Sequence, residues 1–120
     1  MSQTINGRAP IDVEAHTAND TLTTAENGTC HTNDGASGAI TLTLPPAVKG
    51  LRYHFSVEVA QQLRIDPDGT ETISLPSSGV PGAAGKYLVA DAIGETVHLA
   101  CFKNGSWRVV GYTGTWTAEA

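Results

Sequence analysis

Residues 51–59, Leu-Arg-Tyr-His-Phe-Ser-Val-Glu-Val, decide the fold class. Apolar side chains occupy every second position, and polar or charged residues fill the positions between them. In a β-strand this spacing places all five apolar side chains on one face, whereas a helix would distribute them around its axis. The segment therefore predicts a strand with one buried face.

The same alternation continues outward from this strand. Residues 38–44 alternate apolar side chains with threonine, and weaker versions occur at 63–65, 70–75, 86–90, 95–103 and 106–112. Turn-forming residues separate these runs, including Asp66-Pro67-Asp68-Gly69 and the pair Asn104-Gly105, which is typical of a two-residue β-hairpin. The pattern predicts an all-β domain of roughly eight or nine strands: an antiparallel β-sandwich, a jelly roll or a small barrel.

Length and charge narrow the class of protein further. The chain has 120 residues, of which 16% are charged, and a formal net charge of −5. This size is typical of one domain, and the acidic balance argues against nucleic acid as a partner. No apolar run approaches the length of a membrane span, so no membrane partner is expected. Because residues 1–4 lack a basic and apolar leader, we expect synthesis in the cytoplasm.

The N-terminal residues differ from the rest. Residues 1–20 contain few large apolar side chains, so they cannot bury enough surface to fold on their own. We therefore expect an extended N-terminal arm over residues 1–20 and a single β domain over residues 21–120. The arm would become ordered only where a neighbouring surface takes it up.

Little in the sequence points to catalysis, a metal or a cofactor. The four histidines, His16, His31, His54 and His98, are far apart and follow no metal-ligand spacing. The acidic run 66–71 resembles the start of a calcium loop but lacks its final glutamate, which favours a plain β-turn. We expect no catalytic residue, no metal ligand and no cofactor.

The cysteine and aromatic residues are expected to pack in the core or to form contacts rather than to take part in catalysis. Cys30 and Cys101 are the only cysteines, and two free thiols are favoured, although a disulfide between them stays open. Trp107 is expected in the core. Tyr112 and Trp116 are expected to contact another subunit or a host surface.

Several segments resemble small virion proteins of tailed bacteriophages and related modules of phage fibres. The similarity covers roughly residues 20–118 and is carried by the stretches 32–45, 50–55, 63–67 and 107–116. It implies a β-rich, non-enzymatic structural protein, most often a capsid decoration (cement) protein on the outside of the virion, made in the bacterial host. A tail or head fibre module that binds host glycan is the alternative, and an enzyme acting on cell-wall sugar is a third reading.

The resemblance also suggests partners. A decoration protein binds between major capsid subunits, and an extended arm can add a strand to an exposed sheet edge of such a subunit. The arm residues expected to contact the major capsid protein of the same phage are Ile5, Arg8, Pro10, Ile11 and Val13. Self-association as a trimer is expected, with Tyr112 and Trp116 as contact residues. The enzyme reading would require Asp66, Asp68 and Glu71 to converge in a pocket.

Overall fold

The computed structural model describes residues 12–120, which form eleven strands and one 3₁₀ helix, η1 (Thr24–Glu26). Among these residues there is no helix with the length and apolarity to cross a membrane. The strands are β1 (Val13–Ala15), β2 (Asp20–Thr21), β3 (Cys30–Thr32), β4 (Ile40–Thr43), β5 (Arg52–Ser56), β6 (Leu63–Asp66), β7 (Thr72–Ile73), β8 (Leu88–Ala90), β9 (Thr96–Lys103), β10 (Ser106–Thr113) and β11 (Thr117–Ala118).

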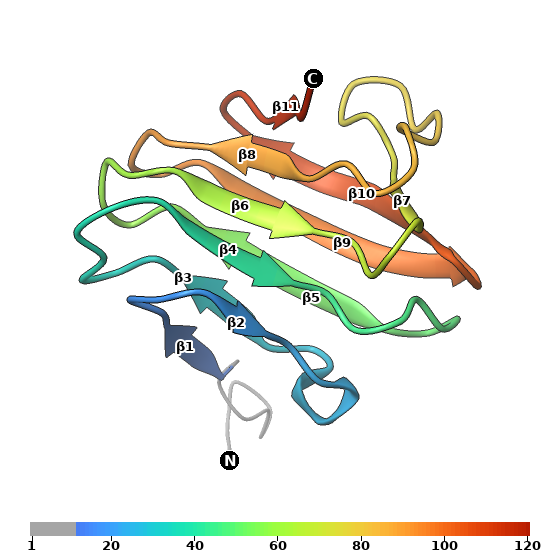
Figure 1. The fold of residues 1–120 in the computed structure, drawn as a ribbon, viewed down its shortest axis with the longest axis horizontal. Helices are drawn as coiled ribbons and strands as arrows, with labels where there is room; N and C mark the ends of the chain where they lie inside the picture. Colours follow the sequence, from blue (N-terminus) through green and yellow to red (C-terminus); the bar gives the residue numbers. More distant parts are fainter. Residues whose placement is uncertain (1–11) are drawn as a thin grey trace, which may run out of the picture.

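The strands form two sheets that share one hydrophobic core. The larger sheet has the order β1-β3-β5-β9-β10-β7, and the smaller one has the order β11-β8-β6-β4-β2. Figure 1 shows the smaller sheet lying across the larger one, with β1, β2 and β3 gathered at one end of the molecule. The all-β class predicted from the sequence is therefore confirmed.

The first six strands wind alternately through the two sheets. β1, β3 and β5 lie side by side and parallel in the larger sheet, while β2, β4 and β6 do the same in the smaller one. Paired residues are 17 to 24 positions apart, from Val13 with Cys30 to Cys30 with His54. We call β1–β6 the parallel coil.

The prediction of antiparallel neighbours is wrong for much of the fold. Five of the nine strand pairs are parallel, so both sheets are mixed. The reason is that most turns carry the chain across to the opposite sheet instead of back along the same sheet. The exception is Asn104-Gly105, which joins β9 to β10 in the antiparallel hairpin that this pair predicted.

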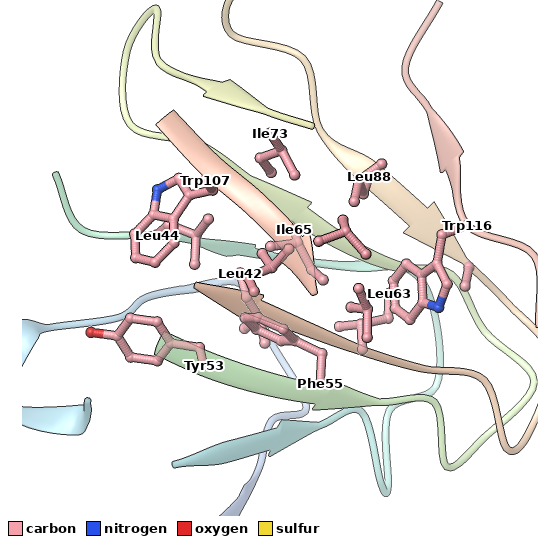
Figure 2. Packing of buried hydrophobic residues seen from close by; sticks show 14 of the residues in the cluster. Leu42, Leu44, Tyr53, Phe55, Leu63, Ile65, Ile73, Leu88, Trp107 and Trp116 are labelled. Atoms are coloured by element: carbon pink, nitrogen blue, oxygen red, sulfur yellow. The ribbon is translucent and has the colours of Figure 1, made fainter. Parts of the chain in front are cut away.

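Alternating burial within the central strands of both sheets builds the core. Tyr53, Phe55 and Val57 are at most 1% exposed, and the polar residues between them point outward, as the 51–59 pattern predicted. Leu42, Leu63 and Ile65 of the smaller sheet meet these side chains in the same cluster. Figure 2 shows the buried side chains of both sheets directed into the space between them, with Trp107 among them.

The predicted arm is only partly within the described residues. Ile5, Arg8, Pro10 and Ile11 lie outside them. Val13 lies in β1, which pairs with β3, and the chain reaches β2 by Asp20. Residues 13–20 are therefore part of the folded body, because β3 and β4 supply the neighbouring strands that the sequence alone did not reveal.

Candidate functional site

A cluster of ionisable side chains lies at the start of the parallel coil, where β1 pairs with β3. Glu14 of β1 pairs in register with His31 of β3, so their side chains leave the larger sheet on the same side. His16 follows Glu14 by two residues and therefore projects to that side as well. Its backbone N–H donates to the Thr32 carbonyl, which continues the pairing beyond β1.

The three side chains bring their polar atoms together. His16 Nε2 lies 2.9 Å from His31 Nδ1, and Glu14 Oε1 lies 3.7 Å from each of these two nitrogens. Both imidazoles are buried, at 5% exposed for His16 and 0% for His31, whereas the side chain of Glu14 is 51% exposed. The two imidazoles are thus enclosed by the protein, and the Glu14 side chain is the part of the cluster that faces solvent.

The hydrogen bonds of Thr29 fix the tautomer of His31. The Thr29 hydroxyl donates its proton to the Glu26 carbonyl at 2.5 Å, and its oxygen lies 2.7 Å from His31 Nε2. Since a hydroxyl has one proton, His31 Nε2 must be the donor in that contact. In the neutral ring, the lone pair is then on Nδ1, which faces His16 and Glu14.

Three carboxylates surround the two imidazoles. Asp20 Oδ2 lies 3.6 Å from His16 Nδ1, and the carboxyl groups of Glu14 and Glu26 are neighbours. The interaction with Glu26, and then burial, raises the pKa of Glu14. Although burial raises the pKa of Glu26, the hydrogen bonds from Thr23 and the interaction with Glu14 outweigh it and lower that pKa overall.

Of the two histidines, His31 favours the neutral form. Burial, and then the neighbouring His16, lowers the pKa of His31. Within residues 12–120 Glu14 lies 3.7 Å from nitrogens of both His16 and His31, and Asp20 lies 3.6 Å from His16, whereas neither carboxylate pairs with a lysine or arginine. The cluster therefore places carboxyl groups beside two imidazole nitrogens, and its donor atoms lie close enough together to hold one metal ion.

The sequence did not predict this cluster. His16 and His31 are separated by fifteen positions, and only the parallel pairing of β1 with β3 brings them together. Glu14 and His16 fall within the segment predicted as an arm, and nothing in the sequence identified β3 as the strand that would lie beside it.

The two predicted contact aromatics have different positions. Tyr112 is 43% exposed, as a contact residue requires. Trp116 is only 5% exposed, and its Nε1–H donates to the Thr96 carbonyl at 2.8 Å, so the prediction of a surface role for Trp116 is wrong. The physical reason is that Trp116, just before β11, packs into the core between the sheets.

Both cysteines are free thiols, so the alternative of a disulfide is not realised. Cys101 is 2% exposed and belongs to the core, whereas Cys30 sits half-buried in register with His54, which lies on the outer side of β5. The two side chains thus face opposite sides of the larger sheet. Burial raises the pKa of each thiol.

The remaining polar residues singled out by sequence do not gather into this cluster. His54 stacks on His98 with ring centroids 3.9 Å apart on the outer face of β5 and β9. Asp68 lies in the turn after β6, where its carbonyl accepts from the Glu71 N–H, and the Glu71 carboxylate accepts from the Ala47 N–H. The predicted turn is therefore present, but it lies at 68–71, because Asp66 is the last residue of β6.

No protein-family model matches the chain, and no curated protein is detectably similar to it.

Proposed function

We propose that this protein is a structural component of a bacteriophage particle, of the kind that decorates and stabilises the capsid. The resemblance of four segments to virion proteins motivates the proposal. The observation that carries it is the position of β1 and β2, which are the outermost strands of the two sheets and lie at the same end of the molecule (Figure 1).

Backbone pairing gives this end a means of binding. An edge strand presents N–H and C=O groups that can pair with a strand from another chain. Val13 of β1 is 61% exposed, which adds an apolar contact at that edge. Residues 1–11 belong to the predicted arm and precede β1 in the sequence. We therefore expect these residues and the edge of β1 to bind the same capsid subunit. Binding the assembled shell better than free subunits would stabilise the shell by mass action.

In this role, the two mixed sheets would act as a sandwich rather than as a barrel or a jelly roll. A core filled from both sheets makes a rigid body that holds the binding edge in one orientation. Rigidity lowers the entropy lost when the protein binds.

Electron cryo-microscopy of the parent virion tests the proposal. We expect density for the β domain on the capsid exterior, with residues 1–15 against the major capsid protein. Val13→Asp is expected to reduce occupancy, because it places a charge at the edge. Val48→Asp is the matched control at another exposed valine, 51% exposed, and should bind normally. Density confined to the tail would contradict the decoration role.

One observation favours the fibre alternative. The exposed Tyr112 borders a shallow hollow of about 240 Å³, together with Pro76, Ser77 and Thr115. An aromatic ring beside such a hollow can stack on a sugar. Glycan-array binding that Tyr112→Ala abolishes would favour the fibre role, whereas the decoration role predicts no glycan binding.

A further inference from the structure

The cluster of Glu14, His16 and His31 offers the donor atoms of a zinc site. Two imidazole nitrogens and one carboxylate oxygen are a common zinc ligand set. Ligands at zinc distances around a tetrahedral ion are about 3.3–3.6 Å apart. The separations between His16 Nε2, His31 Nδ1 and Glu14 Oε1 are 2.9, 3.7 and 3.7 Å. Widening the His16–His31 gap by roughly 0.4 Å and shortening each Glu14 gap by roughly 0.1 Å would bring all three into this range.

The groups behind the ligands are also those of a metal site. A ligating histidine usually donates its second N–H to a carboxylate, a carbonyl or another fixed acceptor, which orients the ring. His31 does so already, because its Nε2–H donates to Thr29 and leaves the Nδ1 lone pair directed at the cluster. This arrangement is independent of the ligand distances.

Asp20 supplies the corresponding acceptor for His16. Without metal, His16 Nε2–H donates to the lone pair of His31 Nδ1. When a metal takes His16 Nε2, the neutral ring carries its proton on Nδ1 instead, 3.6 Å from Asp20 Oδ2. A small movement of the exposed Asp20 side chain would close this hydrogen bond.

Charge also favours a cation here. Glu14, Asp20 and Glu26 surround two histidines, and none of these carboxylates pairs with a lysine or arginine in the part of the chain that the structure describes. The imidazoles select against calcium and magnesium, which prefer oxygen ligands, and favour zinc or a similar first-row ion.

We propose that Glu14, His16 and His31 bind one Zn²⁺ ion that fastens the edge strand β1 to β3, with Asp20 and Thr29 as positioning residues. The ion would retain one coordination position on the solvent side, next to the half-exposed Glu14. The proposal stands independently of the virion role, since it concerns only residues of this chain.

Metal titration of the full-length protein tests the site. The protein is first treated with a chelator and dialysed, then titrated with Co²⁺ followed by absorption spectroscopy, and with Zn²⁺ followed by calorimetry. We expect one ion per chain and the visible absorption bands of low-coordinate Co²⁺. Glu14→Gln and His16→Asn should each weaken binding at least ~100-fold, and Asp20→Asn should weaken it roughly 10-fold.

The matched control is His54→Asn, which removes a histidine outside the cluster and should leave the affinity for Zn²⁺ unchanged. His31 is not mutated, because it is fully buried and its replacement could unfold the protein, which would abolish metal binding whether or not His31 is a ligand. Hydrogen exchange gives a second measurement: Zn²⁺ should slow exchange of the β1 and His16 amides in the wild type and not in His16→Asn. Absence of one-to-one binding in the wild type, or unchanged affinity in both ligand variants, would overturn the proposal.

Discussion

Asn33 shows how one buried side chain can organise the backbone around it. Its side-chain oxygen accepts from the N–H groups of Glu58 and Val59, and its amide nitrogen donates to the carbonyls of Val59 and Gln61. The residue is 0% exposed. Four hydrogen bonds therefore fasten the turn after β5 to the segment after β3.

Asn33→Asp is expected to lower the free energy of unfolding by roughly 3 kcal/mol at neutral pH. The substitution buries a negative charge, and it replaces the NH₂ group that donates to two carbonyls with an oxygen that cannot donate. Urea unfolding measures the loss, and acidification should recover part of it because a protonated carboxyl regains a donor. Asn19→Asp is the control, because the exposed Asn19 uses only an acceptor, towards the Thr41 N–H. Equal stability of Asn33→Asp and wild type would contradict the role assigned to Asn33.

Tyr53 links stability to alkaline pH. Its buried hydroxyl donates to the Thr23 carbonyl at 2.7 Å, and burial, with the nearby Glu26 carboxylate, raises its pKa to about 12. The unfolded phenol loses its proton near pH 10. The stabilisation from Tyr53 is therefore complete below pH 10 and is lost as the pH rises towards 12.

Chemical denaturation at several pH values between 9 and 12 tests this expectation. The wild type should lose stability steeply above about pH 10, and Tyr53→Phe should lose less because it has no phenol to ionise. The exposed Tyr112→Phe serves as the control and should keep the wild-type slope. Identical alkaline slopes for Tyr53→Phe and the wild type would exclude Tyr53 as the cause.

At the scale of elements, local pattern and strand position agree well. The alternation at 51–59 predicted both β5 and its buried face, and Asn104-Gly105 predicted the hairpin of β9 and β10. The pairing of strands was not predictable in the same way. Alternation specifies which face of a strand is buried, but it does not specify which strand lies beside it or in which direction.

Gly82 shows how a loop is held against an element. Its N–H donates to the Ile73 carbonyl of β7 at 3.0 Å, and a Cβ on Gly82 would lie 2.6 Å from that same oxygen. The bridge between Ser74 and Pro81 adds to this contact. Only glycine allows the loop over residues 76–85 to approach β7 this closely.

Gly82→Ala is expected to destabilise the protein by roughly 1–3 kcal/mol, because the added methyl group must push apart two backbone segments. Thermal unfolding measures the loss, and limited proteolysis should show faster cleavage within residues 76–85. Gly38→Ala is the control, since no atom lies within 4 Å of its added Cβ. Unchanged cleavage in Gly82→Ala would show that this contact does not hold the loop.

At the scale of the whole molecule, exposed apolar residues bear on assembly. Phe102 and Val110 are 58% and 43% exposed and line a hollow of about 620 Å³ on the outer face of β9 and β10. Tyr112 is exposed further along β10. Apolar surface of this kind often marks a contact with another subunit.

We expect the purified protein to form a trimer, which light scattering would detect as three times the mass of one chain. Val110→Asp should shift the population towards monomer by placing a charge in that hollow, whereas Ile93→Asp, at an exposed apolar residue in the turn before β9, should not. A monomeric wild type at every concentration would contradict this expectation.

The sequence by itself determined the all-β class, the positions and buried faces of the main strands and the β9–β10 hairpin, because these depend on local alternation and on turn residues. The tertiary structure alone decided the parallel coil, the burial of Trp116 and the meeting of Glu14, His16 and His31. Each of these depends on contacts between residues more than a dozen positions apart. Such contacts form only when the whole core packs, and no local pattern encodes that packing.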